Sequence, residues 1–146
     1  MSNATLESRL ATCLLLIRIG VGLVFFMWTL DKFVNPDHAM RVFSHFYMIP
    51  FLTENGAYIV GAAQALVVAA FLAGYLKTWS YGLIFLLHAV STLTPMANYF
   101  NPWEKVNLLF FAAWPMLAAA FTLWWLRDYD TLFSLDARRQ SAPGAA

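Results

Sequence analysis

Charged side chains are scarce in this chain. They make up 12% of the 146 residues, whereas an average soluble domain has about 25%. Hydrophobic residues make up 61% of the sequence, and a soluble protein of this length cannot bury that much apolar surface. The composition therefore predicts an integral membrane protein. The net charge of +1 gives no basic field, which argues against a nucleic-acid partner.

Cysteine is almost absent. The single residue, Cys13, cannot form an internal disulfide, and the sequence has no C-x-x-C pair for dithiol redox chemistry or zinc. It also has no phosphate-binding loop, dinucleotide fingerprint or nucleophile–base set. These absences argue against an autonomous enzyme, and we predict no catalytic residue.

Long apolar stretches recur along the chain. Each has roughly the 20 residues that a helix needs to cross the hydrocarbon core, and lipid-exposed backbone groups must be satisfied within the segment. We therefore predict an all-α protein, an antiparallel four-helix membrane bundle. It would form one domain over residues 1–138, followed by a flexible tail at 139–146. The predicted spans cover about residues 10–30, 57–76, 79–97 and 106–126.

The segment between the first two spans has its own signals. Asn35-Pro36-Asp37 is typical of a helix start, and we expect a short amphipathic helix in the membrane interface that ends near Pro50. An even number of spans places both termini on one side. Five basic residues would lie on that side and three on the other, which favours cytoplasmic termini. The five are Arg9, Lys77, Arg127, Arg138 and Arg139, and the three are Lys32, Arg41 and Lys105.

Three polar side chains interrupt the predicted spans. Arg18 and His88 lie roughly 12 and 13 Å from the inner ends of their spans, and Gln64 lies roughly 18 Å from its own. Polar groups at such depths are costly and often functional, so we predict that the three form one ligand-binding cluster inside the bundle. The alternatives are that Arg18 reaches toward the headgroups or makes a purely structural hydrogen bond, and that His88 is a neutral ring bonded to a neighbouring helix.

Further polar residues occupy the predicted outer ends of the spans. They are candidates for the rim of an outward-facing pocket, and the alternative is that they are ordinary charges at span ends. These rim candidates are Asp31, Lys32, Asn98 and Glu104.

Two histidines in the segment after the first span offer a weak metal site. His38 and His45 are seven residues apart and would share one helix face. Together with nearby methionines they have ligand types that copper accepts. The simpler interpretation is that both are interfacial histidines, and our prediction for the chain is no metal.

Several short motifs resemble the DoxX-like family of small four-helix bacterial membrane proteins, whose relatives include the MauE proteins and the small subunit of thiosulfate:quinone oxidoreductase. The resemblance covers about residues 10–138 and departs at Gln64, where relatives usually carry glutamate. The matching segments are Leu16-Ile17-Arg18-Ile19-Gly20-Val21-Gly22, Leu30-Asp31-Lys32-Phe33, Gly61-Ala62-Ala63-Gln64-Ala65, Leu72-Ala73-Gly74 and Phe133-Ser134-Leu135-Asp136.

The resemblance implies an accessory role in a membrane redox system of the bacterial inner membrane. On this basis we expect an integral subunit or assembly partner of a redox complex, with quinone as the candidate cofactor and larger membrane subunits or a second copy as partners. Two other functions stay open. One is a module that binds or transports a small ligand, and the other is a purely structural, lipid-interacting subunit.

Overall fold

The computed structural model describes residues 3–140, and all regular structure in that range is helical. The all-α prediction is therefore confirmed. The elements are α1 (Asn3–Val34), α2 (Pro36–Tyr47), α3 (Glu54–Leu72), α4 (Lys77–Leu93), α5 (Met96–Tyr99), η1 (Asn107–Ala112), α6 (Ala113–Trp125), η2 (Arg127–Tyr129) and α7 (Leu135–Gln140).

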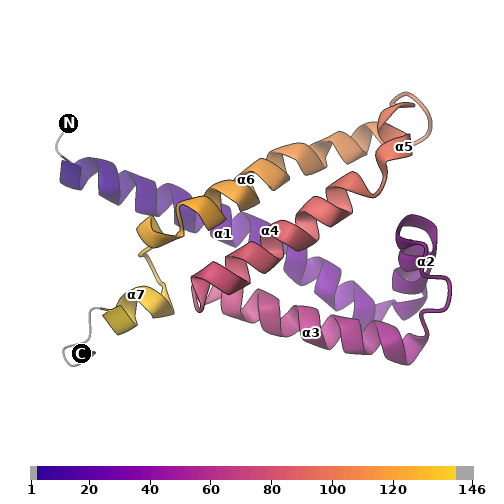
Figure 1. Cartoon of the computed structure of the whole chain (residues 1–146), viewed down its shortest axis with the longest axis horizontal. Coiled ribbons are helices and arrows are strands. Elements are labelled where there is room, and N and C mark those ends of the chain that lie inside the picture. The colour runs from indigo at the N-terminus through magenta and orange to yellow at the C-terminus, as the bar shows by residue number, and fades with distance from the viewer. Residues whose placement is uncertain (1–2, 141–146) are drawn as a thin grey trace.

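The four long helices pack in a cycle. α1 contacts α3, α3 contacts α4, α4 contacts α6, and α6 contacts α1. In Figure 1, α1 and α4 run away from the end of the molecule that holds both termini, whereas α3 and α6 run back toward it. α2 and α5 lie at the opposite end. The helices enclose a buried apolar core made of Leu14, Val21, Phe25, Val68, Phe71, Tyr81, Ile84 and Leu123.

Three helical segments are long and apolar enough to cross a membrane. They are Ala4–Val34, Glu54–Leu72 and Asn107–Trp125. Large apolar side chains on them face outward, for example Leu66 at 75% exposed and Leu109 at 72%. Lipid or a partner protein must cover this surface, because its exposure to water would be costly. The number of spans beyond these three stays a prediction.

The predicted third span, 79–97, differs most from the structure. α4 begins at Lys77 and stops at Leu93, after 17 residues, which is about 26 Å of helix against a core of about 30 Å. Pro95 lies two residues after this end. Because proline has no N–H to donate, it ends the helix, and the chain continues as the separate short helix α5.

The first and last spans also differ from their predicted bounds. α1 has 32 residues, or about 48 Å, so it begins well before the predicted start at residue 10. In the last span, residues Asn107–Ala112 form a 3-10 helix before α6 begins at Ala113. Pro115 explains this boundary, because proline is tolerated in the first turn of an α-helix but not deeper in it.

The predicted helix after the first span is present as α2. Pro36 occupies its first turn and follows Asn35, and Met48 closes the helix in the left-handed conformation at φ 58°. The position of α2 is therefore confirmed, while its placement in a membrane interface stays a prediction. At the other end of the chain, residues 139 and 140 of the predicted tail belong to α7. Residues 141–146 lie outside the described range.

The turn between α3 and α4 depends on a glycine. Gly74 has φ +60°, a conformation that side chains with a Cβ rarely adopt. A Cβ at this position would lie 2.5 Å from Arg18 Nη1 and 2.9 Å from the backbone of Ser134. The glycine therefore permits both the turn and the close approach of two distant segments.

We predict that Gly74→Ala lowers the free energy of unfolding by more than about 1 kcal/mol, because the new methyl group is strained and meets backbone that cannot easily move. Gly20→Ala is the matched control, since a Cβ there meets nothing within 4 Å. Unfolding in detergent micelles, followed by circular dichroism, measures both. Equal stability of the two variants would contradict the conclusion that the turn requires glycine at position 74.

Candidate functional site

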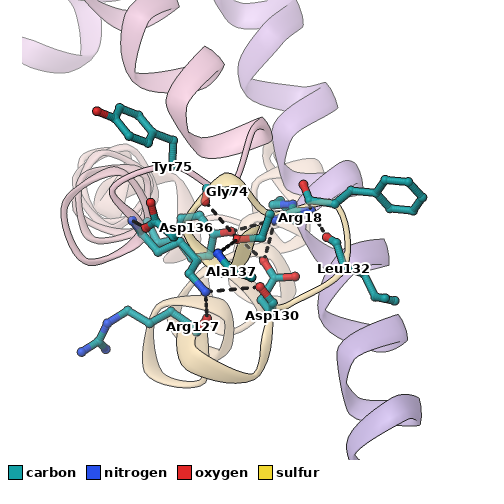
Figure 2. Close-up of polar contacts among 12 residues, drawn as sticks. Arg18, Gly74, Tyr75, Arg127, Asp130, Leu132, Asp136 and Ala137 are labelled. Carbon is teal, nitrogen blue, oxygen red and sulfur yellow. Dashed lines mark hydrogen bonds and ion pairs between the residues drawn. The ribbon is translucent and has the colours of Figure 1, made fainter. Parts of the chain in front are cut away.

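Arg18 lies in the middle of α1 and is 1% exposed. Its Nη1 donates to Asp130 Oδ2 and to the Tyr81 hydroxyl, each at 3.0 Å. Its Nη2 donates to the carbonyl oxygens of Leu132 at 2.6 Å and Phe133 at 3.2 Å. Figure 2 shows the guanidinium enclosed by the chain that follows α6. The charge is thus neutralised and hydrogen-bonded inside the protein.

Asp130 is the counter-charge of Arg18. It is fully buried, and its Oδ2 also accepts a 2.6 Å hydrogen bond from the Tyr81 hydroxyl. The three side chains therefore form a closed triangle. The other carboxylate oxygen, Oδ1, has no hydrogen-bond partner among the described residues. Removing one member of a buried ion pair leaves an uncompensated charge, which is strongly destabilising.

A second cation and a second acid lie beside this triangle. Lys77 Nζ donates to the carbonyl oxygens of Arg127 at 2.8 Å and Asp130 at 3.3 Å. The Asp136 carboxylate accepts from the backbone N–H groups of Leu76 at 3.1 Å and Lys77 at 2.9 Å. Free N–H groups at a helix start need acceptors, and a negative charge there also suits the helix dipole. Asp136 thus serves as a cap for α4 from a remote part of the chain.

The segment after α6 is also bonded to the α3–α4 turn through its backbone. The N–H of Leu135 donates to the Ala73 carbonyl at 3.0 Å, and that of Asp136 donates to the Gly74 carbonyl at 3.1 Å. Ser134 Oγ donates to the same Gly74 carbonyl at 3.0 Å. We call this set of interacting side chains the polar junction, formed by Arg18, Lys77, Tyr81, Asp130, Ser134 and Asp136.

The structure places His88 away from the polar junction. The imidazole is buried, its Nε2 lies 3.0 Å from the Ala113 carbonyl oxygen, and its ring lies about 6 Å from the rings of Phe25 and Trp28. Arg18 instead meets Tyr81, which precedes His88 by seven residues, or roughly 10 Å along α4. The interpretation of His88 as a ring bonded to a neighbouring helix matches this geometry.

Gln64 also lies outside the polar junction. It precedes the end of α3 at Leu72 by eight residues, or roughly 12 Å, whereas Arg18 approaches Gly74 beyond that end. Gln64 is partly buried, and no side-chain hydrogen bond joins it to another described residue. Arg18, Gln64 and His88 therefore do not form the single predicted cluster. The predicted depths used helix ends that the structure moves, most of all in α1.

Sequence reasoning missed the partners of Arg18. Asp130 belongs to the run Arg127-Asp128-Tyr129-Asp130, which is typical of ordinary charges after a span, and Tyr81 has the profile of an interfacial aromatic residue. A buried arginine does require an acceptor, and the segment Phe133-Ser134-Leu135-Asp136 was recognised as a motif. Neither signal linked Arg18 to this segment, and neither could distinguish Asp130 from Asp128.

The predicted rim residues divide into two groups. Asn98 and Glu104 line one cavity of about 360 Å³ near α5. Asp31 instead pairs with His38, with 2.7 Å between Oδ2 and Nδ1, and Lys32 Nζ donates to the Trp28 carbonyl at 3.0 Å. Asp31 and Lys32 do not line this cavity, and each is satisfied within α1 or by α2. One rim shared by all four residues stays a prediction.

The histidines of α2 have different surroundings. His38 pairs with Asp31, whereas His45 lies beside Phe46, with 4.6 Å between ring centroids, and lines the cavity near α5. Within residues 3–140, no three His, Cys, Asp or Glu side chains gather in a group that could hold a metal ion. The weak copper alternative therefore gains no support.

The family model of the methylamine utilisation protein MauE matches residues 10–107. The chain belongs to the MauE family. The match runs from α1 into the start of η1 and includes Arg18 and Tyr81, while Asp130 lies beyond it. No curated protein and no solved structure matches the chain.

Membership of the MauE family confirms part of the predicted resemblance, since MauE was among the relatives named. Together with the apolar helices, it identifies the chain as a membrane protein. The wider relation to DoxX-like proteins stays a prediction.

We predict that Arg18→Met lowers the free energy of unfolding by about 3–5 kcal/mol, because Asp130 then remains buried without its cation. Tyr81→Phe removes hydrogen bonds but keeps the ion pair, and should cost about 1–2 kcal/mol. Arg41→Met is the control, since Arg41 is an exposed arginine of α2. Denaturant unfolding in micelles gives all three values. If Arg18→Met behaved like Arg41→Met, the buried pair would not be structural.

Proposed function

We propose that this protein is a non-catalytic integral subunit, or assembly partner, of a redox system that serves methylamine utilisation. One observation carries the proposal. The most unusual polar group of the chain, the Arg18 guanidinium, is occupied by four acceptors of the protein itself. It therefore serves the fold and is not free for substrate. Membership of the MauE family supplies the connection to methylamine utilisation.

The outer surface supports a role in assembly. α1, α3 and α6 expose many large apolar and aromatic side chains, including Leu16, Ile59 and Trp125 at 64%, 70% and 64%. A surface of this kind is satisfied by lipid tails or by the helices of a larger subunit. Such a partner would place its own catalytic groups beside a rigid, non-reactive bundle.

The proposed topology is an antiparallel four-span bundle in the bacterial inner membrane, with α1, α3, α4 and α6 as spans. Both termini lie at the same end of the molecule in Figure 1, and this end carries the larger number of basic residues. The positive-inside rule then places that end in the cytoplasm. α4 is short for a span, and a small local thinning of the bilayer accommodates such a helix at modest cost.

Cysteine labelling tests this topology. In a Cys13→Ser background, Trp103→Cys should react with a membrane-impermeant maleimide in intact cells, because the loop of Trp103 would face outward. Asp128→Cys should react only after the membrane is opened. Both positions are exposed, so accessibility within the protein is matched. The reverse labelling pattern would contradict the proposed orientation.

The proposal also includes a candidate ligand site at His88. Its Nδ1 is buried and has no hydrogen-bond partner among the described residues, while the neighbouring Trp28 is 40% exposed. Because Nε2 donates to the Ala113 carbonyl oxygen, Nδ1 of the neutral ring is an acceptor. A ligand hydroxyl that reaches the ring from the lipid side, such as that of a reduced quinone, would satisfy it. Phe25 and Ile84 belong to the packed core and are buried, whereas Trp28 is partly exposed, so a quinone would enter beside Trp28.

Purification from the native membrane in a mild detergent tests the proposed function. We expect oxidoreductase chains to co-purify in fixed proportion, because the exposed apolar helices would be covered by them. Solvent extraction of the same sample tests for quinone, and His88→Leu should lower the amount recovered. A preparation that contains this chain alone, without other subunits or quinone, would contradict the proposal.

A further inference from the structure

A cavity of about 360 Å³ opens at the end of the molecule opposite the termini, between α2 and the loop that joins α5 to η1. Its size falls within the range of small-molecule sites, which combine apolar walls with a few polar groups. Phe46 and Phe110 provide apolar wall, with ring centroids 5.9 Å apart. The polar lining residues are His45, Asn98, Asn101, Glu104, Lys105 and Asn107.

Hydrogen bonds between asparagines fix the shape of this cavity. Asn98 Nδ2 donates to Asn107 Oδ1 at 2.9 Å, and Asn107 Nδ2 donates to the Asn101 carbonyl at 2.9 Å. Lys105 adopts φ 50° without being glycine. Such a conformation is costly and persists where the surroundings demand it, often at binding sites. The loop that carries the charged residues is thus held in one shape.

The cavity presents two opposite charges that are not paired with each other. Glu104 and Lys105 are adjacent in sequence and both line it, yet no ion pair joins them, and neither side chain has a hydrogen-bond partner within residues 3–140. A ligand that carries both a cation and an anion would neutralise both groups through charge-assisted hydrogen bonds.

Exposed apolar residues beside the cavity are compatible with a membrane boundary. Trp103 and Val106 flank the two charges in sequence and are 85% and 63% exposed. Tryptophan at the end of a span is typical of the headgroup level of a bilayer. A molecule that reaches this cavity from the membrane therefore enters with its headgroup at the level of Glu104 and Lys105.

We infer that the cavity binds a phosphoethanolamine group, supplied by the headgroup of a phospholipid. Lys105 meets the phosphate, and Glu104 meets the ammonium. A primary ammonium has three N–H donors for the carboxylate and for the Asn98 side-chain oxygen. Choline has none, and it is usually held by a cage of aromatic rings, which Phe46 and Phe110 alone do not form. The inference rests on the proposed topology, which puts this end of the molecule at a membrane surface, and not on the redox partner.

Native mass spectrometry of the full chain in micelles tests this site with short-chain phosphatidylethanolamine, phosphatidylcholine and phosphatidylglycerol. We expect ethanolamine lipid to bind up to about fivefold tighter than either other lipid, since an exposed ion pair contributes up to about 1 kcal/mol. Water-soluble phosphoethanolamine is a fourth ligand. Binding of the lipid but not the soluble form identifies the membrane as the source, and equal binding identifies a soluble ligand of the same chemistry.

Two charge variants separate the roles of Glu104 and Lys105 in lipid binding. Glu104→Gln should remove the preference for ethanolamine over choline, while Lys105→Gln should weaken the ethanolamine lipid severalfold. The matched controls are Glu54→Gln and Arg41→Gln, exposed charges at the same end of the molecule that do not line the cavity. Equal affinity of the unmodified protein for all three lipids, or site variants that behave like the controls, would overturn the inference.

Discussion

The ion pair between Arg18 and Asp130 is the constraint on which the rest of the structure depends. It joins residues 112 positions apart in the sequence, and both side chains are almost fully removed from solvent. A charge in such surroundings is tolerated only when it is paired and hydrogen-bonded. The segment after α6 must therefore fold back against α1, because no other described residue neutralises the arginine.

Several local features of the chain follow from this requirement. Gly74 leaves room for the guanidinium at the α3–α4 turn, and Tyr81 donates to the same carboxylate oxygen that Arg18 contacts. Asp136 then caps the start of α4 from the returning segment. Each of these contacts lies at the end of the bundle that holds the termini. At this end the buried Arg18 and Asp130 are paired with each other, and only Asp130 Oδ1 lacks a partner among the described residues. The opposite end has a cavity lined by the unpaired charges of Glu104 and Lys105.

Much of the fold could be predicted from the sequence. Length and hydropathy indicated the apolar helices, and Pro36 indicated the start of α2, because proline at a first helical position is a local signal. The helix ends were less predictable. Pro95 follows the end of α4, while Pro115 lies in the first turn of α6, since the effect of proline depends on its position in the helix.

The candidate site could be predicted only in part. Arg18 and His88 were identified from their cost in an apolar span, but their partners depend on helix register over long distances. A shift of seven residues along α4 exchanges His88 for Tyr81 opposite Arg18. No pattern in the sequence fixes such a shift, and the acid that completes the pair lies outside the predicted spans, at Asp130.

A double-mutant cycle on Arg18 and Asp130 tests the central claim most directly. The unfolding free energies of the parent, Arg18→Met, Asp130→Leu and the combined variant give the coupling between the two side chains without the effects of each change alone. If the pair holds the returning segment in place, the coupling should exceed about 2 kcal/mol, and the combined variant should be more stable than either single one. A coupling below about 0.5 kcal/mol would show that the two charges act independently and would contradict the account.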